Sequence, residues 1–400
     1  MTAEIAVMNK GAIALAADSK VTVTSGGVTK TYDTVSKLFT LSKVAPIGIM
    51  VYGNADFMGF PWETIIKLYR RQKGIKTEKR VTEWADDFFK FVRAFGEISK
   101  KDKDNNVASL LLSTLSDLAR QVDEWTIGVG LPHEAPEHRE YLLAMLKSRA
   151  EIAMKSQPWV TKNAAAALIK RYGPTILATI NGVMDGYSDD IKREAVPLLV
   201  ATLAMQISSP QASGVVIAGF GDDEYFPTLV EYQTEGYVGN GVKLWLLPPI
   251  IDVSRNFTAC IRAFAQREMV QRFMEGIDPY YSMYLGGAIP ELVVDNCFDT
   301  LQKYGMKKNN SNDVRAKIRS AVADAVASFE SDARTYRQER FSDPVIRMVS
   351  VLPKDELAHL AESLVALTSL KRRVSSDAET VGGPVDVALI SKGDGFVVHP

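Results

Sequence analysis

Cysteine and histidine are both scarce in this sequence of 400 residues. The two cysteines, Cys260 and Cys297, are too few for the disulfide framework of a small secreted domain. Cys260 lies in an apolar segment with a helical pattern, which indicates a core position rather than a nucleophile. The four histidines are scattered, and His133 and His138 fall in a proline-rich loop without a nearby cysteine. We therefore expect neither a metal site nor a cofactor.

A strong net charge, a long apolar run and a basic leader are absent as well. The formal net charge is −1, so charge gives no reason to expect binding to nucleic acid or to an anionic membrane. No apolar run approaches the roughly 18 residues of a membrane span. The first residues do not show a basic stretch followed by an apolar core. We therefore expect a cytoplasmic protein.

Strand and helix patterns form separate blocks along the chain. Hydrophobic residues make up 46% of the sequence and charged residues 24%, which is typical of a globular protein. Alternating apolar segments predict a β-rich stretch over residues 3–53, and strands return over residues 213–246. Apolar residues at three- and four-residue spacing predict helices over most of 75–210 and 279–350, and over Phe257–Glu275. This distribution supports the α+β class.

The first 18 residues predict a short β-hairpin. Apolar residues alternate on both sides of the turn signal Asn9-Lys10-Gly11. A hairpin folded at this turn sets Thr2 opposite Ala17 or Asp18. Local strand geometry therefore predicts a carboxylate beside the start of the chain.

Thr2 follows Met1, and such a small second residue allows an aminopeptidase to remove Met1. Thr2 would then carry both a hydroxyl and a free α-amine. A threonine hydroxyl is a weak nucleophile that needs an adjacent base. An α-amine has a reference pKa of about 7.7–8.0, so it can accept that proton near neutral pH. The alternative is an ordinary hairpin in which Asp18 is only a polar residue at the end of a strand.

Six segments, in order along the chain, share a resemblance to one family. They are Thr2–Val7, Gly11–Lys20, Val35–Phe39, Ile47–Gly53, Ser213–Gly219 and Gly382–Ile390. The ordered set resembles proteasome β-type subunits and the related bacterial ATP-dependent peptidase, which exposes its threonine by removal of Met. Val35-Ser-Lys-Leu-Phe39 resembles the strand that carries the family's active-site lysine, and Ile47–Gly53 resembles the strand that ends in its active-site glycine.

This resemblance implies a fold. Proteasome-type subunits are N-terminal-nucleophile hydrolases in which two antiparallel sheets lie between helical layers, a four-layer αββα arrangement. For this chain the resemblance implies a single domain over residues 1–400, in which two long helical stretches are insertions. The expected core comprises about residues 1–74, 211–278 and 351–400, and the expected insertions about residues 75–210 and 279–350.

The resemblance also implies roles for four residues. Thr2 is the nucleophile with its α-amine as general base, and Asp18 helps to orient that amine. Lys37 lies on the covered face of an expected strand, where Asp18 is its natural partner and its charge would lower the pKa of the Thr2 amine. Gly53 offers its backbone N–H to the oxyanion. Without the resemblance, Lys37 is equally an exposed lysine of an edge strand and Gly53 a strand-to-helix turn.

Two family features near the end of the chain differ from the family pattern. Asp377 and Thr380 match its supporting Asp and Ser, but one extra residue separates them from the glycine pair that begins at Gly382. The family's Gly-Ser-Gly before a helix is missing, and Arg262–Gln266 occupies roughly that place. That serine supports the threonine amine in the family. Its loss leaves two alternatives, a substitute such as Gln266 or weakened or absent catalysis.

We therefore expect a threonine-type peptidase that cleaves peptide or protein substrates, with a small-molecule amidase as a variant. The resemblance further implies a homo-oligomer and an ATP-dependent unfoldase as a partner, with no nucleic acid or membrane partner. The competing hypothesis is a proteasome-like assembly or interaction protein without catalysis, built around the two helical insertions.

Overall fold

The computed structural model describes residues 2–25, 28–32, 35–96, 98–304, 311–375 and 382–399. Over these residues the chain combines helices with antiparallel sheets, which confirms the α+β class. The chain folds into two compact units. Unit 1 comprises Met1–Val35, Val253–Leu389 and Val398–Pro400, and unit 2 comprises Ser36–Asp252 and Ile390–Val397.

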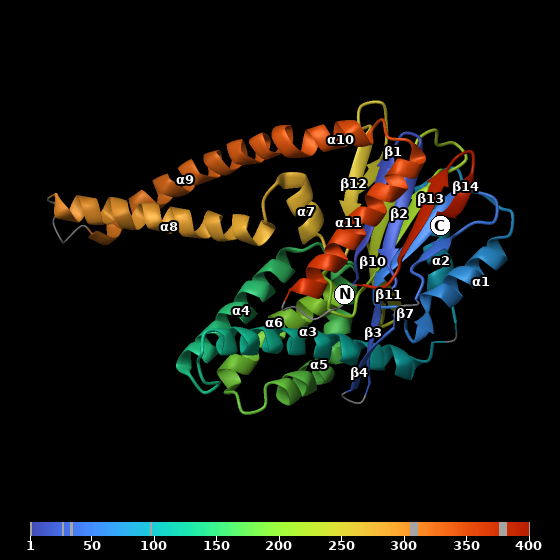
Figure 1. Cartoon of the computed structure of the whole chain (residues 1–400). Helices are drawn as coiled ribbons and strands as arrows, with labels where there is room; N and C mark the ends of the chain where they lie inside the picture. The colour runs from blue at the N-terminus through green and yellow to red at the C-terminus, as the bar shows by residue number, and fades with distance from the viewer. Residues whose placement is uncertain are drawn as a thin grey trace. The chain divides into compact units, whose positions relative to one another are not determined.

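The N-terminal strands of unit 1 belong to a five-stranded sheet with the order β12-β1-β2-β13-β14. Its strands are β1 (Glu4–Asn9), β2 (Ala12–Asp18), β12 (Ala259–Ala263), β13 (Val385–Ser391) and β14 (Gly395–His399). Alternate residues Ala12, Ala14 and Ala16 present small side chains on one face of β2. Helix α11 (Lys354–Val374) packs on that face of β1 and β2, as Figure 1 shows, because small side chains allow a close approach.

The β1–β2 hairpin has a register that differs from the predicted one. The N–H of Asp18 donates to the carbonyl of Ala3 over 3.1 Å, so Ala3 rather than Thr2 lies opposite Asp18. The cause is the side chain of Asn9. Its Oδ1 accepts hydrogen bonds from the N–H of Gly11 over 2.9 Å and from the N–H of Ala12 over 3.3 Å. These bonds close a connection between Met8 and its partner Ile13 that is longer than the turn signal suggested.

The expected helix over Phe257–Glu275 is wrong in its first half. Ala259–Ala263 form β12, which pairs antiparallel with β1, and only Glu268–Glu275 form a helix, α7. Pairing with β1 gives the backbone of this segment its hydrogen bonds and buries Ala259 and Ala263. This tertiary gain outweighs the helical spacing of the apolar residues.

Two long helices of unit 1, α8 (Pro279–Lys303) and α9 (Ser311–Arg337), run side by side (Figure 1). Ion pairs join Arg319 to Glu291 over 2.9 Å and Arg315 to Asp295. A cavity of about 570 Å³ is lined by both helices. The π-helical turn η2 (Gln338–Ser342) and α10 (Asp343–Val349) follow. Large apolar side chains of this helical hairpin are exposed, among them Tyr280, Met283, Tyr284, Leu292, Phe329 and Tyr336.

Unit 2 is built on a second five-stranded sheet with the order β11-β10-β9-β6-β5. Its strands are β5 (Leu38–Thr40), β6 (Ile47–Gly53), β9 (Ser213–Gly219), β10 (Thr228–Val238) and β11 (Gly241–Asp252). Helices α1 (Trp62–Lys73) and α2 (Val81–Ala94) pack their aromatic side chains on this sheet. Two small hairpins are β3 (Val21–Ser25) with β4 (Val28–Tyr32), in unit 1, and β7 (Asp56–Phe57) with β8 (Phe60–Pro61), in unit 2.

Four further helices of unit 2 share a separate apolar core. They are α3 (Lys100–Gly128), α4 (Pro136–Lys155), α5 (Lys162–Val183) and α6 (Asp189–Ala204). The hydroxyl of Ser99 and the carboxylate of Asp102 form a capping box that fixes where α3 begins. Pro136 at the first position of α4 has the backbone angle that a helix start needs.

Both stretches expected as insertions are mainly helical, and each lies in a unit that also contains a sheet. Residues 279–350 belong to unit 1, and residues 75–210 belong to unit 2. That they are insertions into one domain stays a prediction. Within the described part of the chain, no helix combines the length and apolarity that crossing a membrane requires.

A buried ion pair fixes the sheet of unit 2 to the end of α6. The side chains of Lys243 on β11 and Glu235 on β10 are 0% and 1% exposed, and their charged atoms lie 2.5 Å apart. Lys243 Nζ also donates to the carbonyls of Thr202 over 2.8 Å and Ile207 over 2.9 Å. Burial lowers the pKa of Lys243, while the charge of Glu235 acts in the opposite direction. The pair is therefore a structural element with its hydrogen bonds satisfied inside the protein.

Replacing Lys243 by methionine tests this interpretation. Lys243→Met is expected to lower the free energy of unfolding by about 3–5 kcal/mol, because Glu235 would remain buried without its partner. Adding Glu235→Leu is expected to restore part of the loss, because it removes the isolated charge. The control is Lys67→Met, which removes an exposed ion pair between Lys67 and Glu63, whose side chains are 58% and 52% exposed. It is expected to lower the free energy of unfolding by less than about 1 kcal/mol. Urea unfolding measures the stability of all three variants. Equal losses of unfolding free energy in Lys243→Met and Lys67→Met would contradict the interpretation.

Candidate functional site

Thr2 lies two residues before β1, and its side chain is buried. Its Oγ1 donates a hydrogen bond to Glu4 Oε2 over 3.0 Å, and Glu4 is 1% exposed. Side chains two residues apart on an extended chain share a face, which brings this hydroxyl and carboxylate together. The carboxylate therefore orients the hydroxyl. Glu4 was not expected from the sequence, although a polar residue that alternates with Thr2 at the start of an apolar strand is a usable signal.

The carboxylate of Asp18 holds the main chain next to Thr2. Its Oδ1 accepts the N–H of Ala3 over 2.9 Å, and its Oδ2 accepts the N–H of Gly382 over 3.1 Å. Asp18 itself is 1% exposed, so water does not compete for these bonds. The structure therefore brings together the chain start, Asp18 and the glycine pair that begins at Gly382.

Lys37 and Gly53 lie in unit 2, at the same end of the β5–β6 pair. Lys37 comes just before β5, is 6% exposed, and accepts the N–H of Val51 at its carbonyl over 3.1 Å. Gly53 has a φ of +79°, and a Cβ at this position would lie 2.4 Å from the carbonyl oxygen of Ala212. Only glycine fits there without strain. The catalytic roles of both residues stay predictions.

The residues expected near the end of the chain have different outcomes. Asp377 and Thr380 lie outside the described residues. Gln266, which stands where the family has Gly-Ser-Gly, is 3% exposed, and its Oε1 accepts a hydrogen bond from Arg372 Nε over 2.8 Å. Its Nε2 has no hydrogen-bond partner among the residues that the structure describes. A buried amide donor is thus available in the segment that follows β12.

Cys260 does not qualify as a nucleophile. It lies on β12, not on a helix, and burial raises the pKa of its thiol to about 11. The thiol therefore stays protonated at neutral pH, whereas the thiolate is the reactive form.

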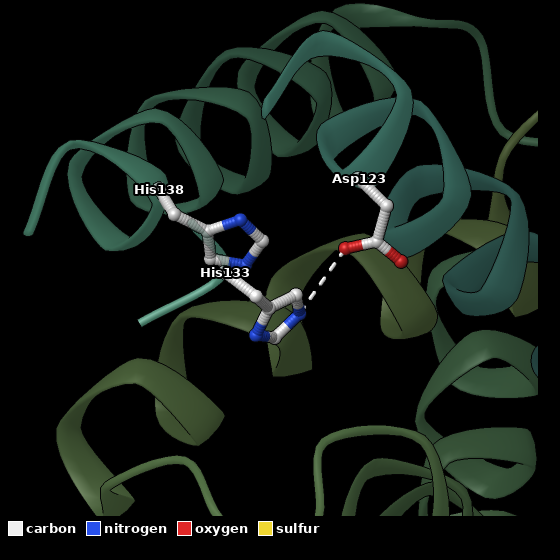
Figure 2. A group of neighbouring side chains, drawn as sticks. All are labelled: Asp123, His133 and His138. Carbon is white, nitrogen blue, oxygen red and sulfur yellow. Dashed lines mark ion pairs between the residues drawn. The ribbon is translucent and has the colours of Figure 1, made fainter. Parts of the chain in front are cut away.

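A second cluster of polar side chains was not expected from the sequence. Asp123 on α3, His133 in the α3–α4 loop and His138 on α4 lie together, as Figure 2 shows. His133 Nε2 is 3.2 Å from Asp123 Oδ1, and the two imidazole ring centroids are 4.1 Å apart. Burial, followed by the charge of His133, lowers the pKa of His138. The sequence placed both histidines in one loop, but His138 is the third residue of a helix that begins at Pro136.

Comparison with known proteins adds no relationship for this chain. It matches no protein-family model, and no curated protein matches it significantly. The resemblance carried by Thr2–Val7 and the segments that follow it therefore remains the basis for a functional proposal.

Asp18→Asn tests whether Asp18 holds the chain start. The variant is expected to lose about 1–3 kcal/mol of unfolding free energy. The side-chain amide of asparagine has one oxygen, so it can replace only one of the two carboxylate oxygens that accept the N–H groups of Ala3 and Gly382. Asp223→Asn changes the same chemical group at an exposed position and is the matched control. Urea unfolding at neutral pH measures both. A value for Asp18→Asn within error of the control would show that these hydrogen bonds do not stabilise the fold.

Proposed function

We propose that this chain is a threonine-type N-terminal-nucleophile hydrolase that cleaves amide bonds in peptides or proteins. The observation that carries the proposal is the pair of hydrogen bonds from Ala3 and Gly382 to Asp18. They hold the main chain directly after Thr2 in one position, and a nucleophile held in place reacts faster than a mobile one. The contact between Thr2 and Glu4 gives the hydroxyl a defined direction as well.

The chemistry requires removal of Met1, because the Thr2 nitrogen is otherwise part of an amide and cannot accept a proton. The hydroxyl oxygen of Thr2 then bonds to the carbonyl carbon of the substrate amide, while the hydroxyl proton passes to the α-amine. The C–N bond breaks, the departing amine takes up that proton, and an ester joins Thr2 to the acyl group. Water attacks the ester with the same α-amine as base, which releases a carboxylic acid and restores Thr2.

The remaining residues have supporting roles in this proposal. Lys37 and Gly53 keep the roles that the resemblance implies, a positive charge for the amine and an N–H for the oxyanion. Gln266 takes the place of the family's serine, and its buried Nε2 is the donor that supports this assignment. Asp377 and Thr380 remain candidates for the supporting Asp and Ser. The proposal includes the four-layer αββα arrangement, a single domain, a homo-oligomer, and an ATP-dependent unfoldase that delivers protein substrates.

A non-catalytic assembly protein is the second candidate, and the α8–α9 hairpin favours it. Tyr280, Met283 and Tyr284 are more than 60% exposed on one stretch of α8. Exposed groups of large apolar side chains mark interaction surfaces. The absence of Gly-Ser-Gly agrees with this candidate. The two candidates differ in whether Thr2 reacts.

Thr2→Ala is the decisive variant. Intact-mass analysis of the wild-type protein is expected to show loss of Met1, and an electrophile directed at N-terminal threonine is expected to add once. Thr2→Ala is expected to lose this labelling and to lower peptidase turnover by about 10³-fold or more, because the attacking oxygen is gone. Its free energy of unfolding is expected to fall by about 1 kcal/mol, since one buried hydrogen bond to Glu4 is lost.

Thr335→Ala is the control, because Thr335 is an exposed residue on α9. It is expected to leave labelling, turnover and stability unchanged. Retention of Met1 on the native protein would reject the hydrolase proposal and favour the assembly protein. Equal turnover in Thr2→Ala and Thr335→Ala would have the same meaning.

A further inference from the structure

We propose that Asp123, His133 and His138 form a binding site for one zinc ion in unit 2. One ligand atom from each residue lies within 4.8 Å of the other two. Figure 2 shows the two imidazole rings next to one another, with His133 turned toward the carboxylate of Asp123. Two imidazoles and one carboxylate are a donor set that zinc uses when water occupies its fourth position.

The spacing between two of the ligand atoms already matches a zinc site. Asp123 Oδ1 and His133 Nε2 lie 3.2 Å apart. Two ligands bound tetrahedrally to one zinc ion at about 2.0–2.1 Å stand roughly 3.3 Å from each other. A zinc ion can therefore replace the direct contact between these two atoms with little movement of either side chain.

The hydrogen bonds of His138 identify Nε2 as the nitrogen that can serve as the third ligand. The hydroxyl of Thr126 donates its proton to the carbonyl of Val122 over 2.8 Å, a bond that threonine commonly makes to the residue four positions earlier in a helix. Thr126 Oγ1 is also 2.8 Å from His138 Nδ1, so at this contact the hydroxyl oxygen accepts and Nδ1 carries the hydrogen. The lone pair of the ring is then on Nε2. Metal-binding histidines are oriented in the same way, by a donor bond from the other ring nitrogen.

The lone pair of His138 Nε2 already accepts a hydrogen bond from Tyr187. The Tyr187 hydroxyl lies 2.8 Å from His138 Nε2 and donates to it. Zinc binding requires this hydroxyl to turn to another acceptor, because Nε2 has one lone pair. Tyr187 therefore competes with the metal, and removing its hydroxyl should tighten binding.

Burial differs among the three ligands in a way that suits metal uptake. His138 is 1% exposed and is held by Thr126 and Tyr187, whereas the side chains of His133 and Asp123 are 58% and 47% exposed. A fixed ligand next to two accessible ones gives zinc an entry path from solvent. Bound zinc would join the last turns of α3 to the first turn of α4, and it would stabilise the helical bundle by mass action.

Zinc titration of the untagged full chain, after treatment with a chelator, tests the proposal. Calorimetry is expected to show one equivalent of Zn²⁺ bound with micromolar or tighter affinity, and Co²⁺ in its place is expected to give the visible absorption of a tetrahedral site. His133→Ala and Asp123→Asn are each expected to weaken binding at least about 10-fold. The side chains of both residues are about half exposed, so their variants should fold.

Two buried positions separate metal binding from general stability. Thr126→Val is expected to weaken zinc binding by about 10–100-fold through loss of the bond that orients His138, and Thr126→Ser is expected to restore it. Tyr187→Phe is expected to bind zinc as tightly as the wild type or more tightly, although it loses a buried hydrogen bond. If the two hydroxyls acted only on stability, Thr126→Val and Tyr187→Phe would change zinc binding in the same direction.

His359→Ala is the matched control. His359 is also 58% exposed and lies 3.9 Å from a carboxylate, that of Glu362, but it is not part of a three-ligand group within the described residues. This variant and Thr2→Ala are expected to bind zinc like the wild type. No saturable binding of one equivalent, or equal affinity in His133→Ala and His359→Ala, would overturn the proposal.

Discussion

The carboxylate of Asp18 is the constraint on which the candidate site depends. Gly382 lies 364 residues further along the chain, yet its N–H and that of Ala3 meet the two oxygens of one side chain. Buried main-chain N–H groups must find acceptors, and an ionised carboxylate offers two without presenting any hydrogen of its own. One residue thereby fixes both the position of Thr2 and the approach of the last sheet strands. The hydroxyl of Thr2, held by Glu4, takes its direction within that frame.

Unit 2 has a comparable constraint in Lys243, which works with the opposite charge. The three hydrogens of its ammonium have three acceptors, the carbonyls of Thr202 and Ile207 and the carboxylate of Glu235. A shift of one residue in the pairing of β10 and β11 would turn Lys243 to the other face of the sheet. The pair therefore selects one register, and with it the position of the sheet against α6. The zinc site proposed between α3 and α4 of this unit is formed by other residues, Asp123, His133 and His138.

Local patterns were enough to predict the β1–β2 hairpin and the helical character of the two long stretches, because alternation and helical spacing are properties of neighbouring residues. The register of the hairpin was missed, since the side chain of Asn9 decides it. The strand at Ala259–Ala263 was missed because its partner, β1, lies far away in the sequence. Asp123 and His133 meet because the chain reverses direction after α3, and no spacing rule contains that reversal. Specific side-chain and long-range contacts, rather than propensities, decided each of these cases.

The order of strands in the first sheet has a consequence for synthesis on the ribosome. β1 and β2 emerge first, but their outer neighbours, β12 and β13, begin at Ala259 and Val385. At about 5–20 residues per second, the hairpin waits roughly 10–50 s before β12 is made. During that time both of its edges carry unpaired N–H and C=O groups, which invite pairing with other nascent chains. The N-terminal hairpin is therefore the part of this sheet most exposed to wrong strand pairing during translation.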